Sequence, residues 1–124
     1  MQSGKFILSE VEGLPLVEVA GDVDLSNVSD LKAALERAAA KDQGAVVVAL
    51  HKASYFDSQT IHALKEFRDR LQTNRQRLLV VAPGTSSARR ILKIAGMMES
   101  LAMFESIEEA IASTRGKNSP VMGP

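Results

Sequence analysis

The sequence predicts an α/β domain with a mixed, mostly parallel β-sheet of four to five strands, flanked by about four helices. Two observations support this fold class. Short runs of valine, isoleucine and leucine alternate along the chain with longer segments whose apolar residues recur at helical spacing. The length of 124 residues suits one domain and is too short for two ordinary ones.

The strands are expected at the short apolar runs. The first two runs are separated by a segment that contains Gly13 and Pro15 and favours a turn, so we expect a hairpin there. Two later runs are continuously apolar, which is typical of strands covered on both faces. The expected strands are 6–8, 14–20, 45–50 and 78–82, with a last short strand at 101–104.

The helices are expected between these runs. The first covers residues 27–41, with Ser26 or Asn27 as its N-cap and Asp30 in its first turn. Gly96 is expected to end the third helix and Ser106 to cap the fourth. The apolar stripes are Val28, Leu31, Ala34, Leu35 and Ala38, then Ile61, Leu64, Phe67 and Leu71, then Ala88, Ile91, Leu92 and Ala95, then Ile107, Ala110 and Ile111. The predicted order is β-β-α-β-α-β-α-β-α.

The domain is expected to cover residues 1–114. The tail 115–124 contains glycine, proline and asparagine without periodicity, so we expect it to be disordered. The N-terminal residues lack the apolar core of a signal peptide, and the longest apolar runs are too short to span a bilayer. These features predict a cytoplasmic protein.

Composition argues against several function classes. Fifteen basic and fifteen acidic side chains give zero formal charge, which disfavours direct nucleic-acid binding. The arginines at positions 68, 70, 75 and 77 are interpreted as a solvated helix end and loop. The absence of cysteine excludes thiolate catalysis, iron–sulfur clusters and cysteine-based zinc sites.

Enzyme chemistry finds little support in the motifs. There is no glycine-rich phosphate loop, and the small residues 83–87 are better explained as a strand-to-helix turn with a serine cap than as an anion site. His51 and His62 lack the spacing of a metal pair. Adjacent Asp57 and Ser58 would not form the usual nucleophile–base–orienter chain with either histidine. We therefore expect no enzymatic activity, no cofactor and no metal.

Two polar segments are not explained by packing. Residues 21–26 carry Asp22 and Asp24 directly after the second strand, and residues 55–60 carry Asp57 and Ser58 between the third strand and the second helix. Strand-to-helix loops at the carboxyl ends of parallel strands usually form the binding surface of such a sheet. The alternative is structural: Asp57 and Ser58 cap a helix, and Asp24 merely starts one.

These segments resemble motifs of the STAS domain of bacterial anti-sigma factor antagonists. Residues 21–24, Gly-Asp-Val-Asp, are similar to that family's Gly-acid-aliphatic-Asp motif, and residues 55–58, Tyr-Phe-Asp-Ser, are similar to its central loop. The pattern of its third helix resembles Pro83, Arg89, Arg90, Leu92 and Gly96, and its closing strand and helix resemble residues 104–110. The resemblance covers residues 4–113.

The resemblance implies a phosphorylation switch. In this family the serine after the Asp is phosphorylated by a partner that is both anti-sigma factor and serine kinase, and only the unmodified protein binds that partner. Ser58 would be the acceptor. The partner-binding residues would be Asp22, Asp24, Ser26, Asp57, Ser58, Gln59, Thr60, Ile61 and His62.

The sequence also departs from the family pattern. Gln59 replaces the usual Ser or Thr, Thr60 replaces Gly, and His62 stands where a small residue is common. One alternative is therefore a STAS interaction module of a transporter or stress-signalling complex without a phosphorylation switch, and another is an unrelated enzyme or small-ligand protein. The oligomeric state is left as monomer or weak homodimer, since an exposed edge strand could support pairing.

Overall fold

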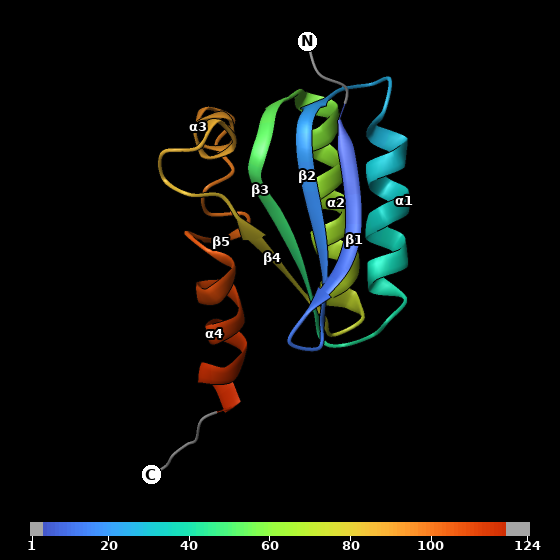
Figure 1. Cartoon of the computed structure of the whole chain (residues 1–124), viewed down its shortest axis with the longest axis vertical. Helices are drawn as coiled ribbons and strands as arrows, with labels where there is room; N and C mark the ends of the chain where they lie inside the picture. Colours follow the sequence, from blue (N-terminus) through green and yellow to red (C-terminus); the bar gives the residue numbers. More distant parts are fainter. Residues whose placement is uncertain (1–3, 119–124) are drawn as a thin grey trace.

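The computed structural model describes residues 4–118, which form one five-stranded sheet with four helices (Figure 1). The strand order in the sheet follows the chain, β1-β2-β3-β4-β5; β1 is antiparallel to β2, and all other pairs are parallel. The elements are β1 Lys5–Val11, β2 Leu14–Val23, α1 Val28–Ala39, β3 Ala45–Phe56, α2 Ser58–Thr73, β4 Arg77–Val81, α3 Ser87–Ile94, β5 Ala102–Phe104 and α4 Ile107–Asn118. The predicted fold class and element order are confirmed.

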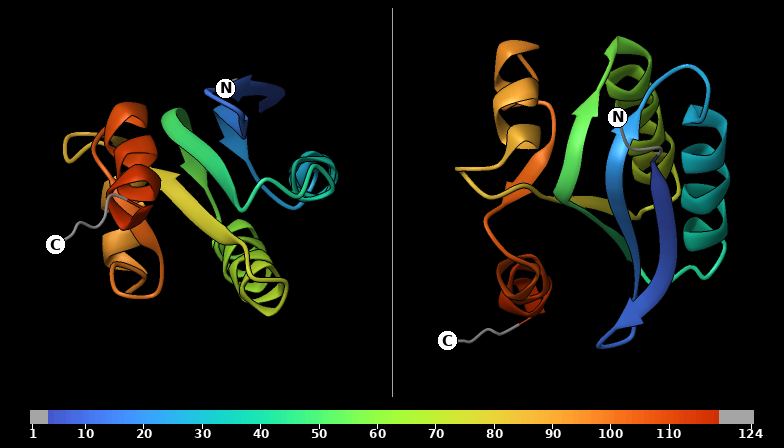
Figure 2. Two further views of the ribbon diagram at one scale, coloured as in Figure 1. Left: turned by 90° about the horizontal axis from the view of Figure 1, so that it is seen from below. Right: turned by 45° about the horizontal axis from the view of Figure 1, so that its top comes forward.

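The sheet separates two apolar clusters. The larger one joins one face of the sheet to α1, α2 and α3, with Leu31, Leu64 and Leu92 as fully buried contributions from the three helices. The smaller one joins the other face to α4 through Ala110 (Figure 2). Alternate residues of β3 and β4 enter opposite clusters, which explains why these two strands are continuously apolar in sequence.

Strands β2 and β3 are longer than the sequence indicated. β4 pairs with β3 only over Ala45–Ala49, whereas β2 follows β3 to its last residue, where Val23 lies opposite Phe56. The register of β2 shifts twice on the way, and the second shift coincides with Gly21, whose φ of 80° favours glycine. These extensions carry the two polar segments beyond the end of β4.

The helix ends largely match the predicted signals. Gly96 follows α3 with a φ of 75°, and the Ser106 hydroxyl accepts a hydrogen bond from the Glu109 N–H at 3.1 Å. Helix α4 continues to Asn118, four residues beyond the expected boundary at 114. The rest of the expected disordered tail, residues 119–124, lies outside the described residues. Within residues 4–118, no helix has the length and apolar character needed to cross a membrane.

The packing of α2 on the sheet gives a stability prediction. Leu64 has no exposed surface, and Lys65 beside it is exposed. We expect Leu64→Ala to lower the free energy of unfolding by about 2–5 kcal/mol, because the substitution leaves a cavity in the larger cluster. Lys65→Ala should change it by less than about 0.5 kcal/mol. Urea denaturation of both variants measures the difference, and equal effects would contradict this packing.

Candidate functional site

The two polar segments meet at one end of the molecule. Residues 24–27 connect β2 to α1, and Asp57 connects β3 to α2, so both lie at the carboxyl ends of neighbouring parallel strands. Figure 1 shows this end at the top of the molecule, where α1 and α2 begin. The structure therefore brings together residues that are more than thirty positions apart in the chain, as the parallel-sheet argument predicted.

The carbonyl oxygen of Val23 joins the two segments. It accepts a hydrogen bond from the backbone N–H of Asp57 at 3.3 Å and one from the Thr60 hydroxyl at 3.5 Å. Thr60 is 2% exposed, so this hydroxyl and its partners are shielded from water. The end of β2 is thus fixed against the first turn of α2.

Asp57 is the N-cap of α2. Its Oδ1 accepts hydrogen bonds from the Thr60 N–H at 3.1 Å and from the Thr60 hydroxyl at 3.2 Å. A carboxylate at this position satisfies an otherwise free N–H and meets the positive end of the helix dipole. The capping role that the sequence offered as the structural alternative therefore belongs to Asp57, whereas Ser58 is the first residue of the helix and is exposed.

Asn27 organises the β2–α1 loop. Its Oδ1 accepts a hydrogen bond from the Asp24 N–H at 2.9 Å, and its Nδ2 donates to the Asp22 carbonyl at 3.0 Å. Asn27 is the N-cap of α1 by position, as expected, but its side chain makes no capping hydrogen bond because it binds the loop behind it. The loop that carries Asp24 is held in one shape by these two contacts.

Asp24 is the carboxylate of this loop, and its charge is stabilised by Ser26. Its Oδ1 accepts hydrogen bonds from the Ser26 hydroxyl at 2.5 Å and from the Ser26 N–H at 2.9 Å, and these bonds lower the pKa of Asp24 below its ordinary value. The group is therefore an anion at neutral pH. The expected partner-binding residue Ser26 thus has a local role, which is to hold this charge in place.

Two exposed apolar side chains flank the acidic residues. Leu25 is 73% exposed between Asp24 and Ser26, and Tyr55 is 50% exposed two residues before Asp57. Neither was predicted as a binding residue. Leu25 lies between polar residues of the loop and Tyr55 near the end of β3, so the exposure of both could be assigned only after folding. Tyrosine and leucine beside charged groups are typical of protein-binding surfaces.

The predicted site residues are not equally accessible. Ser58 and Gln59 are exposed, Asp22 is half-buried opposite Tyr55, and Thr60 is buried. Ile61 is half-buried and packs against the larger cluster. His62 lies one turn after Ser58 along α2, and its Nε2 lies 3.1 Å from Glu66 Oε2. Contact of these residues with a partner stays a prediction.

The arrangement does not resemble a catalytic centre. Within residues 4–118, the Ser58 hydroxyl has no hydrogen-bonded histidine that could act as its base, since His62 binds Glu66. The same part of the chain has no group of three or more histidines and carboxylates placed to hold a metal ion. What the geometry offers is an exposed hydroxyl at a helix start, beside fixed carboxylates and two apolar side chains.

Comparisons with known proteins give the family and the fold of the chain. A family model described as STAS domain matches residues 5–110. No curated protein sequence matches significantly.

Solved structures show the same fold at low sequence identity. An anti-sigma factor antagonist from Mycobacterium paratuberculosis gives a TM-score of 0.81 at 21% identity, with 91% of this chain and 95% of that chain covered. The anti-sigma factor antagonist SpoIIAA in its unphosphorylated form gives a TM-score of 0.67 at 19% identity, with 90% of this chain and 99% of that chain covered. The phosphorylated form of SpoIIAA, from Bacillus, gives a TM-score of 0.65 at 18% identity, with 90% of this chain and 100% of that chain covered. A sulfate transporter family protein from Wolinella succinogenes gives a TM-score of 0.65 at 22% identity, with 81% of this chain and 83% of that chain covered.

The Val23 junction gives a second prediction. Thr60→Val keeps the shape of the buried side chain but removes the hydroxyl that binds Val23 and Asp57. We expect it to lower the free energy of unfolding by about 1–2 kcal/mol, because a buried hydrogen bond is lost. Thr73→Val is the matched control, since the Thr73 hydroxyl is exposed and binds only the Asp69 carbonyl. If thermal unfolding shows no difference between the two variants, the junction contributes no stability.

Proposed function

The chain belongs to the STAS domain family, and we propose that it acts as an anti-sigma factor antagonist in the cytoplasm. In this proposal it binds an anti-sigma factor that is also a serine kinase, and phosphorylation of Ser58 releases that partner. The protein itself performs no catalysis and does not contact nucleic acid. Its fold is shared with anti-sigma factor antagonists over most of the chain.

One observation carries the proposal. Ser58 is exposed at the first position of α2, and the hydrogen bonds at the Val23 carbonyl hold it beside the loop that carries Asp24. A kinase can reach a hydroxyl at this position without unfolding the domain, because the adjacent cap is made by Asp57 and not by Ser58. SpoIIAA, which has this fold, occurs in a phosphorylated form.

The electrostatics of the surface support a switch. Asp22, Asp24 and Asp57 lie at the same end as Ser58, which favours a partner with basic groups. A phosphate adds roughly −1.5 to −2 charges and lies at the positive end of the α2 dipole, so the fold tolerates it. At the contact with a partner the same charge adds repulsion and desolvation cost, which weakens binding.

Thr60 explains one departure from the family pattern. Glycine at this position would permit close approach of a partner backbone, but Thr60 is buried inside the first turn and its hydroxyl binds the Val23 carbonyl. Threonine therefore replaces backbone freedom with an internal hydrogen bond and leaves the outer surface of the turn to Ser58 and Gln59. The departure is compatible with an accessible phosphorylation site.

A second candidate function follows from the sulfate transporter family protein, which shares the fold at 22% identity. Here the chain would be an interaction module of a transporter or stress-signalling complex, and the surface around Ser58 would bind its partner constitutively. Modification of Ser58 would then have no effect on binding. The two functions thus differ in one measurable property.

Partner capture with Ser58 variants distinguishes them. Wild type, Ser58→Ala and Ser58→Glu serve as baits in the source organism's extract, and bound proteins are identified by mass spectrometry. We expect an anti-sigma factor kinase on wild type and Ser58→Ala, and at least a tenfold loss on Ser58→Glu, which corresponds to about 1.4 kcal/mol of binding free energy. The captured kinase, purified and given ATP, should phosphorylate wild type and not Ser58→Ala.

Ser87→Glu is the matched control for added charge. Ser87 is exposed and is the first residue of α3, so it has the same helix position as Ser58 but a different place on the surface. It should capture the kinase as wild type does. If instead all baits recover the same transporter or scaffold subunit equally, the switch is wrong and the interaction module is the function.

A further inference from the structure

Three side chains on α2 form an exposed stripe that begins at Ser58. Ser58, His62 and Glu66 are spaced by four residues, so they lie one above the other on one side of the helix. All three are exposed, and the side chains of His62 and Glu66 are 67% and 59% exposed. The stripe is separate from the buried side of α2, which faces the sheet through Thr60, Ala63, Leu64, Phe67 and Leu71.

His62 is the central member of the stripe and can reach either neighbour. In the unmodified protein its Nε2 lies 3.1 Å from Glu66 Oε2. Helical side chains lean toward the helix N-terminus and cover the turn before their own Cα, which for His62 is the turn that starts at Ser58. An acidic group placed four residues before a cation is also the more favourable order on a helix.

We propose that His62 is the counter-ion of phosphorylated Ser58. On phosphorylation the imidazolium exchanges Glu66 for the phosphate, which has more negative charge and lies at the start of the helix. The pairing changes the pH at which the phosphate of phosphorylated Ser58 loses its second proton. The inference rests on the proposed function in one respect, that Ser58 is the residue that is phosphorylated.

Within residues 4–118, His62 is the cationic side chain of the stripe that begins at Ser58. The charged residues of the same helix near His62 are Asp57, Lys65 and Glu66, and Lys65 lies off the stripe, three residues after His62. The charged side chain of the β2–α1 loop, which lies at the same end of the molecule, is Asp24, an anion that repels a phosphate. From α1, which packs against α2, the charged side chains that line their shared groove are Lys32 and Glu36.

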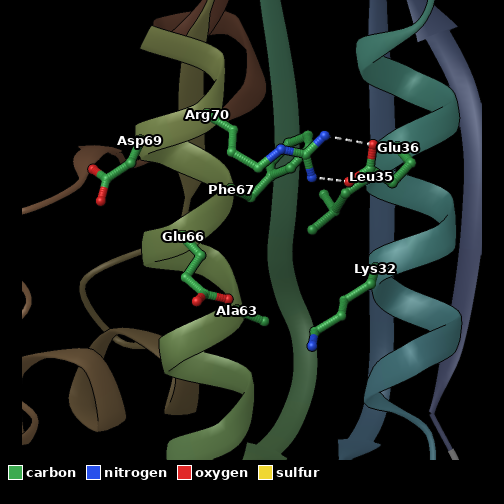
Figure 3. Close-up of a pocket in the computed structure, with 8 residues that line it drawn as sticks. All are labelled: Lys32, Leu35, Glu36, Ala63, Glu66, Phe67, Asp69 and Arg70. Atoms are coloured by element: carbon green, nitrogen blue, oxygen red, sulfur yellow. Dashed lines mark hydrogen bonds and ion pairs between the residues drawn. The ribbon is translucent and has the colours of Figure 1, made fainter. Parts of the chain in front are cut away.

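The exchange would alter the groove between α1 and α2. This groove has a volume of about 410 Å³, with Leu35, Ala63 and Phe67 among its lining residues. Figure 3 shows Lys32 and Glu66 on its two sides, and two hydrogen bonds from Arg70 to Glu36 that cross it. Those bonds lower the pKa of Glu36 and occupy Arg70. Glu66, once released by His62, would lie across the groove from Lys32.

The direction of the pH effect follows from charge. A phosphoserine loses its second proton near pH 6, and a histidine in water is largely protonated at that pH. A nearby imidazolium stabilises the phosphate dianion, so it lowers the pH at which the second proton leaves.

Phosphorus NMR measures this shift directly. The full chain is made with phosphoserine encoded at position 58, so no kinase is needed and the protein carries a single phosphorus signal. We expect the midpoint of its second ionisation in low salt to lie roughly 0.2–0.4 pH unit below that of the same protein with His62→Gln. Added salt should reduce the difference, because both groups are exposed.

Two further variants make the test specific. Glu66→Gln removes the carboxylate that competes for His62. The midpoint of this variant should be equal to or lower than that of the phosphorylated protein with Glu66. His51→Gln removes the only other histidine, which is exposed on β3, and should leave the midpoint unchanged. Equal midpoints with and without His62, or the same effect from His51→Gln, would overturn the inference. Failure to capture a kinase would contradict the proposed function and would leave this NMR result unaffected.

Discussion

The parallel pairing of β2 with β3 beyond the last residue of β4 is the constraint on which the site depends. It places Val23 opposite Phe56, so the next residues of both strands emerge side by side. The Val23 carbonyl then has two donors within reach, the Asp57 N–H and the Thr60 hydroxyl. Without this extension the acidic loop and the start of α2 would not be held together, and neither segment alone forms a surface.

The fold could be predicted because its signals are local. Continuous apolar runs indicated buried parallel strands, and helical stripes such as Leu31 and Leu35 indicated the faces that pack on the sheet. The ends of the long strands were missed for a physical reason. In the second half of β3 the buried residues Ala53 and Phe56 are each preceded by two exposed residues, and the expected second strand ended at residue 20, just before Gly21, where the structure has a shift of register.

The site could be predicted only in outline. The meeting of the acidic loop with the start of α2 could be predicted because loops at the carboxyl ends of parallel strands converge, whereas the role of Ser58 was implied only by the family resemblance and stays a prediction. Thr60 was interpreted as a poor substitute for glycine, since its hydrogen-bond partner Val23 lies 37 residues away and no spacing rule connects the two. Leu25 and Tyr55 were missed because the sequence alone does not tell whether an apolar residue in a loop or near the end of a strand is exposed or folds inward.

The two sides of the first turn of α2 have different contacts, and this difference determines what a phosphate at Ser58 would affect. The inner side, with Thr60 and the capping oxygen of Asp57, is hydrogen-bonded to β2 and contributes to stability. The outer side, with Ser58 and His62, is exposed and bonded only to its own helix. In the proposed switch, a phosphate on the outer side would leave the hydrogen bonds of the cap and the junction in place, so its main effect would fall on partner binding. A switch built in this way needs no conformational change of the sheet, only a partner whose contact surface includes the first turn of α2.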